Sequence, residues 1–68
     1  MRAAGRASSG EVVIQATEEE LVLIYGGLVE AMEALSSAEF RARVGVPASA
    51  AEPLLEALRT IIGEFKRR

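Results

Sequence analysis

The sequence of 68 residues contains no histidine, cysteine, aspartate, asparagine or tryptophan. These types supply most catalytic bases, most metal ligands and many of the groups that read DNA bases. The serines have no histidine to activate them, and disulfides are excluded. Glutamate alone is a poor basis for a structural metal site. We therefore expect no enzyme, no catalytic residues, no metal and no cofactor.

Long apolar runs are also missing. The longest uncharged run in the predicted first helix is the nine residues of 21–29, whereas a membrane span needs about 20. Residues 1–10 carry two arginines without an apolar run behind them, unlike a signal peptide. We expect a cytoplasmic protein with a disordered tail over 1–10 and a single small helical domain over 11–68.

The small size of the chain limits its stability. A domain of this length buries only about 60% of its unfolded surface. Disulfides, a metal or association usually compensate in such domains. Only association is available here, and 50% of the residues are apolar. The composition therefore favours a chain that binds a second molecule.

Charge is distributed unevenly along the chain, although the net charge is only −2. Residues 1–10 carry two bases, residues 11–40 carry seven glutamates and no base, and residues 41–68 carry six bases and three glutamates. Two explanations stay open: glutamates and bases complement the dipoles of the helix ends, or the halves of two chains attract each other in an antiparallel dimer.

Three capping-box patterns, each a hydroxyl residue followed three positions later by glutamate, organise the chain. They are Thr17–Glu20, Ser36–Glu39 and Ser49–Glu52. Each precedes a segment with helical periodicity, which predicts helices over about 18–35, 38–44 and 50–66. Gly45 is placed to end the second helix in a left-handed conformation, and Pro47 prevents its continuation.

The apolar pattern predicts how these helices pack. We expect the first and third to lie roughly antiparallel, with Leu54, Leu58 and Ile61 facing the core. Phe40, Val44 and Val46 should close one end. The predicted fold is mainly α: a small three-helix domain preceded by one short strand or extended segment.

That segment is 11–16, which is short and β-branched. No second strand follows it, and a lone strand cannot satisfy its backbone groups within its own chain. We expect it to pair with the same strand of a second copy or with the edge of a partner's sheet. The alternative is an extended or helical lead-in without strand pairing.

The first helix has an apolar arc of roughly 180°, wider than the stripe of about 100° on a typical surface helix. A second molecule is the simplest cover. Gly27 and Ala31, with Leu23 nearby, allow a close helix crossing, while the pair Gly26–Gly27 alternatively produces a kink. We predict an interface formed by Val12, Ile14, Val22, Leu23, Gly27 and Ala31.

A DNA-binding role is the alternative. Residues 40–46 followed by 49–62 resemble the rhythm of a helix–turn–helix. The first turns of the third helix, however, offer Glu52 and Glu56 where a recognition helix needs basic or amide side chains. The bases that remain for phosphate contacts are Arg2, Arg6, Arg41, Arg43 and Lys66 to Arg68. Nucleic acid is therefore a disfavoured partner.

Spacings such as Glu19-Glu20-Leu21-x-x-Ile24-x-x-x-Leu28-x-Glu30 and Glu39-Phe40-x-x-Arg43-x-Gly45-Val46, with a later Leu54-Leu55, resemble those of short bacterial proteins. The resemblance covers 11–62 and implies no particular activity. We expect a small non-catalytic protein-interaction module, antitoxin-, immunity- or adaptor-like, that acts as a homodimer or with one protein partner.

Overall fold

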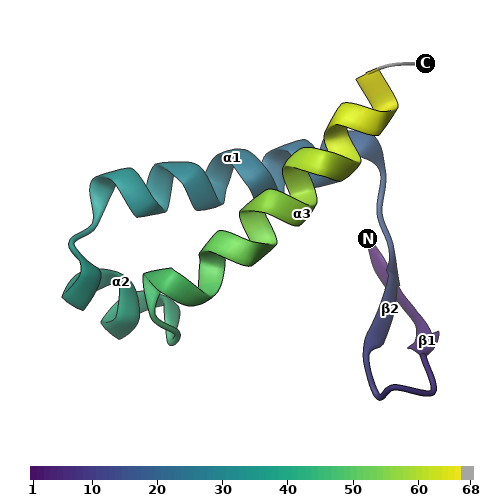
Figure 1. The fold of residues 1–68 in the computed structure, drawn as a ribbon, viewed down its shortest axis with the longest axis horizontal. Coiled ribbons are helices and arrows are strands. Elements are labelled where there is room, and N and C mark those ends of the chain that lie inside the picture. The colour runs from purple at the N-terminus through teal and green to yellow at the C-terminus, as the bar shows by residue number, and fades with distance from the viewer. Residues whose placement is uncertain (67–68) are drawn as a thin grey trace.

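The computed structural model describes residues 1–66 and contains two strands followed by three helices (Figure 1). The elements in chain order are β1 (Arg2–Arg6), β2 (Val12–Gln15), α1 (Glu18–Ala34), α2 (Ser37–Val44) and α3 (Ala48–Lys66). The prediction of a mainly α, three-helix domain is confirmed. Arg67 and Arg68, two of the bases expected near the end of the last helix, lie outside the described residues.

Two of the predicted capping boxes form. At the start of α1, the Thr17 hydroxyl accepts from the Glu20 N–H at 3.1 Å, and the Glu20 carboxylate accepts from the Thr17 N–H at 2.9 Å. Ser36 and Glu39 make the same reciprocal pair for α2, both at 3.2 Å. Gly45 then ends α2 with a φ of 96°, as its position predicted.

The prediction of a third capping box, at Ser49 and Glu52, is wrong. α3 begins at Ala48, so Ser49 lies inside the helix rather than before it. The Pro47 carbonyl accepts from the Ala50 N–H at 3.0 Å. Pro47 thus supplies the first carbonyl that accepts a hydrogen bond in the helix, and its ring fixes its own φ. The Ser49 hydroxyl is not needed to start the helix.

α1 and α3 run in roughly opposite directions and cross each other, with α2 at the end where the chain turns between them (Figure 1). The packed stripe of α1 and its C-cap residue consists of half-buried side chains at spacings of three and four: Leu21, Tyr25, Leu28, Met32 and, at the cap, Leu35. Among residues 1–66, only Phe40, Ala51 and Leu58 are buried, and Phe40 is the most enclosed at 1% exposure.

Several predicted core positions are wrong. Leu58 is buried as expected, but Leu54 and Ile61 are exposed, and so are Val44 and Val46. The reason is that α1 covers α3 along one side only, so the outer flank of the wide apolar arc of α3 has no layer over it. Of the residues expected to close one end, Phe40 alone does so.

The N-terminal segment is also different from its prediction. Residues 1–10, expected as a disordered tail, form β1 and the loop of an antiparallel hairpin with β2. The Ala7 N–H donates to the Glu11 carbonyl and the Gly10 N–H to the Ala7 carbonyl, both at 2.9 Å. These two hydrogen bonds close a three-residue loop over 8–10. Gly10, at a φ of 89°, is the left-handed residue that such a loop requires. The strand over 12–15 is therefore not a lone strand.

β1 escaped prediction because its sequence, Arg-Ala-Ala-Gly-Arg, is poor in the β-branched and aromatic residues that mark strands. Its pairing is irregular between Ala3 and Gly5, where one extra residue forms a bulge. Gly5 has a φ of 128°, which a side chain would strain. The bulge keeps Ala3 opposite Ile14 and Arg6 opposite Val12 on one side of the hairpin.

The hairpin projects away from the helices below the start of α1 (Figure 1). Within residues 1–66, neither strand packs against a helix. The amino group of Met1, next to β1, donates to the Glu20 carboxylate and so joins the hairpin to α1. The two faces and both long edges of the hairpin are therefore left to solvent or to another molecule.

Replacing Phe40 by alanine should leave the chain mostly unfolded. Such a truncation costs about 3–5 kcal/mol, and a domain of this length has a total stability of about 3–10 kcal/mol. Phe40→Leu should retain the fold, and Val44→Ala, at an exposed position on the same helix, should change stability by less than about 0.5 kcal/mol. Urea unfolding followed by circular dichroism checks this. Equal losses for Phe40→Ala and Val44→Ala would contradict the assignment of the core.

Acid should weaken the junction between the hairpin and α1. The amino terminus and the Thr17 N–H lower the pKa of Glu20 from 4.5 to about 2. A lowered carboxyl pKa means that the stabilisation is complete above pH 4.5 and is lost as the pH falls towards 2. NMR titration of the Glu20 carboxyl measures this. Acetylation of the amino terminus should raise that pKa, and an unchanged titration would exclude the contact.

Candidate protein-interaction surface

A groove of about 440 Å³ lies between α1 and α3 and is lined by Val22, Tyr25, Arg59, Ile62, Gly63 and Lys66. Arg59 spans it: its Nε donates to the Tyr25 hydroxyl at 3.3 Å, and its guanidinium carbon lies 5.9 Å from the centre of the Tyr25 ring. The Tyr25 hydroxyl and the Glu56 carboxylate raise the pKa of Arg59, so it stays a fixed cation.

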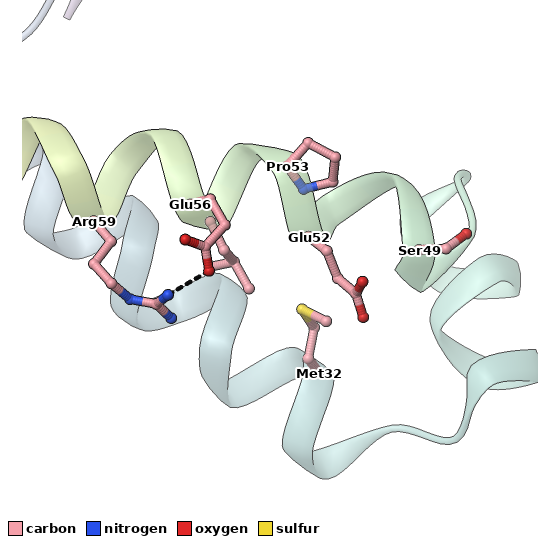
Figure 2. A pocket seen from close by; sticks show the side chains of 7 residues that line it. Met32, Ser49, Glu52, Pro53, Glu56 and Arg59 are labelled. Atoms are coloured by element: carbon pink, nitrogen blue, oxygen red, sulfur yellow. Dashed lines mark hydrogen bonds and ion pairs between the residues drawn. The ribbon is translucent and has the colours of Figure 1, made fainter.

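A second hollow continues along the same side of the helix pair (Figure 2). Met32 of α1 lines it together with Ser49, Glu52, Pro53 and Glu56 of α3, and Arg59 contacts the Glu56 carboxylate at its edge. The carboxylates of Glu52 and Glu56 are exposed to solvent. This side of the helix pair therefore carries the charged groups Arg59, Glu52 and Glu56, next to the apolar Val22 and Ile62 of the groove.

The opposite side of the helix pair is apolar. Val22 and Tyr25 share the groove with Arg59, so they mark the charged side of both helices. At 100° per residue, Ile24 and Leu54 fall on the other flank of their helices, beyond the packed stripe. We call this surface the apolar helix face; its residues are Ile24, Gly27 and Ala31 of α1 and Leu54, Ala57 and Ile61 of α3.

Most of the apolar helix face is exposed. Ile24, Leu54 and Ile61 rank among the exposed large hydrophobic residues, and Gly27 and Ala57 are exposed as well. A Cβ built on Gly27 would have no atom within 4 Å. The chain therefore leaves room against α1 at the place where a close helix crossing was predicted.

The six predicted interface residues lie in three places. Gly27 and Ala31 belong to the apolar helix face, and Leu23 lies beside it with 67% of its surface exposed. Val22 instead lines the groove that Arg59 spans. Val12 and Ile14 lie on the hairpin, both exposed and pointing to the same side of it. The structure thus separates residues that the sequence pattern had grouped, and their role in an interface stays a prediction.

Sequence reasoning missed the contribution of α3 to this surface. Leu54 and Ile61 belong to the apolar arc of their helix and were assigned to the core. The signal that was available is the width of that arc: like the arc of α1, it exceeds the stripe of about 100° that one neighbouring helix covers. Both helices therefore have apolar positions left over.

Within residues 1–66, no polar or charged side chain is buried, and no cluster of three or more histidine, cysteine, aspartate or glutamate side chains has the arrangement of a metal site. None of the helices in this part of the chain has the length and apolarity needed to cross a membrane.

The helix–turn–helix order is present as α2, a turn over 45–47, and α3. The start of α3 exposes alanine, leucine and glutamate side chains, notably Ala50, Leu54 and Glu52. Glutamate repels phosphate, and alanine and leucine read no hydrogen-bonding pattern on a base. Arg41 and Arg43 are exposed in the last turn of α2. This geometry gives little support to sequence reading by α3.

Comparison with known protein families, with curated proteins and with solved structures found no match to this chain.

Proposed function

We propose that this chain is a small non-catalytic protein-interaction module that works as a homodimer or with one protein partner. In this proposal the chain is antitoxin-, immunity- or adaptor-like, which means that binding a protein is itself its activity. The observation that carries the proposal is the amount of surface that the folded chain leaves exposed.

The accessible surface is 5250 Å². A compact monomer of 7.2 kDa exposes about 4,100 Å². The excess of roughly 1,100 Å² exceeds the roughly 800 Å² that one partner contributes to a standard protein–protein interface. The radius of gyration is 13.5 Å, against about 11 Å for a compact domain of this length. The chain is therefore open in shape.

The chemistry of the exposed surface supports a protein as the partner. The apolar helix face combines leucine and isoleucine side chains with Gly27, Ala31 and Ala57, which allow another element to approach closely. The opposite side carries Glu52, Glu56 and Arg59 and suits contact with water. Such an amphipathic pair of helices gains free energy by burying one side against a partner.

Leucine at Gly27 should weaken self-association, and leucine at Gly26 should not. Both glycines are exposed, and a Cβ on either would have no atom within 4 Å, so each change raises helix propensity by a similar amount. Only Gly27 belongs to the apolar helix face. An overpacking cost of about 1–3 kcal/mol there weakens the dimer about 5- to 150-fold.

Sedimentation equilibrium at micromolar to tens of micromolar concentrations measures this, with circular dichroism as the control for folding. The wild-type chain should sediment above 7.2 kDa. A single folded species of that mass, unchanged by both substitutions, would rule out the homodimer.

Binding to random duplex DNA tests the alternative. Two glutamates near the start of α3 and a net charge of −2 oppose the phosphate backbone. Fluorescence anisotropy at low salt should show no saturable binding in the micromolar range. Salt-dependent binding at micromolar concentration or tighter would instead favour a small DNA-binding regulator.

A further inference from the structure

The two long edges of the hairpin differ in chemistry. β1 carries Arg2 and Arg6 and is distorted by the bulge next to Gly5. Charged side chains and bulges are the features with which natural proteins keep an edge strand from pairing. β2 has the sequence Val-Val-Ile-Gln and carries no charge, no proline and no bulge. The edge of β2 therefore lacks every protection that β1 has.

The hairpin also lacks support from its own chain. Within residues 1–66 it forms a sheet of two strands, and neither strand packs on a helix. An isolated pair of strands is marginally stable at best in water, and three or more strands are needed for independent stability. Its three large aliphatic residues, Val12, Val13 and Ile14, are all exposed.

The direction of the backbone groups along β2 follows from the loop. The Glu11 carbonyl accepts from Ala7 and so points towards β1. Successive residues of a strand point their N–H and C=O groups to opposite edges. Val13 therefore faces β1, whereas the backbone groups of Val12 and Ile14 point to the open edge.

We propose that the open edge of β2 pairs antiparallel with β2 of a second copy of this chain, which forms a four-stranded sheet in the order β1–β2–β2–β1. This inference rests on the proposed function, of which it names the partner and the contact. The two unprotected edges meet in the middle of the sheet, and the arginine-bearing, bulged strands become its outer edges.

A two-fold axis at Val13 gives the register. Hydrogen-bonded pairs must join residues whose backbone groups both point to the open edge, so Val12 pairs with Ile14 of the second copy and Ile14 with Val12. Val13 then lies opposite its own copy in a non-hydrogen-bonded pair, with Cα atoms about 4.5 Å apart. The same register places Glu11 opposite Gln15 rather than opposite Glu11, and it leaves Val12 and Ile14 of both copies on one side.

A second copy fits this edge better than an unrelated strand does. An uncharged run of Val-Val-Ile reads nearly alike in both directions, so it is complementary to itself in an antiparallel pair. The surface of roughly 1,100 Å² beyond that of a compact monomer also exceeds what one subunit of a standard dimer buries.

Single cysteines test the register, because the chain has no native cysteine. In a glutathione redox buffer, the Val13→Cys protein should form a disulfide-linked dimer, since Cα atoms about 4.5 Å apart are within bridging range. The matched control is Val12→Cys on the same strand. Its two Cα atoms lie about 8–9 Å apart in this register, beyond the reach of a disulfide.

Cross-linking of Val13→Cys should be at least about tenfold faster, because paired strands hold the two thiols at a millimolar effective concentration. Wild-type sedimentation separates the possible failures. If the chain self-associates but the two cysteine variants cross-link equally, or neither does, the β2 pairing is wrong and the proposed function stands. If the folded chain is a monomer at tens of micromolar, both the pairing and the homodimer are wrong.

A second measurement leaves all side chains unchanged. Chains synthesised with an N-methyl group at Val12 lose one hydrogen-bond donor from the β2 edge, and chains with an N-methyl group at Arg6 lose one from the β1 edge. Sedimentation should show weaker association for the first and no change for the second. Equal effects would overturn the assignment of the β2 edge.

Discussion

The burial of Phe40 is the interaction on which the helical part of this protein depends. Phe40 lies on α2, where the chain turns between the two long helices, and it is the most enclosed side chain of the described residues. Two capping boxes determine where α1 and α2 begin, and the left-handed Gly45 determines where α2 ends. Apart from Phe40, only Ala51 and Leu58 of α3 are buried among the described residues, and α1 contributes a half-buried stripe.

This small core explains the chemistry of the surface. α1 and α3 each have an apolar arc wider than the other helix can cover, so each keeps a second apolar flank. Those flanks lie on the same side of the pair, opposite Arg59 and the hollows that it borders. The result is a thin layer of two helices, with Arg59 and its neighbouring carboxylates on one side and an apolar flank on the other, in a molecule of 35 × 30 × 17 Å.

The hairpin, like the helix pair, exposes apolar residues that no other part of the described chain covers. Its turn has Gly10 in the conformation that the loop requires, and at the other end of the hairpin Arg2 donates to the Gln15 side chain at 2.6 Å. Yet no layer of the described chain lies on either side of it. A hairpin that is locally well formed but unsupported gains most from a partner that adds strands, which is why its unprotected edge and the apolar helix face point to association.

Much of the fold was predictable because the signals are local. Thr17 and Ser36 mark helix starts through hydrogen bonds that span three residues, and Gly45 marks a helix end by its own conformation. β1 was not predictable from its residues: Ala, Gly and Arg have little preference for strands, and only pairing with β2 makes the segment extended. Ser49 misled because a capping pattern two residues into a helix looks the same as one before it.

The sequence by itself determined where α1 and α2 begin, that both long helices are amphipathic, and that no disulfide stabilises the chain. Tertiary structure alone decided which apolar residues are covered. Leu54 and Leu58 lie four positions apart with the same side chain, and one is exposed while the other is buried. The physical reason is that periodicity specifies the angular position of a residue on its helix, whereas burial depends on where the neighbouring helix crosses.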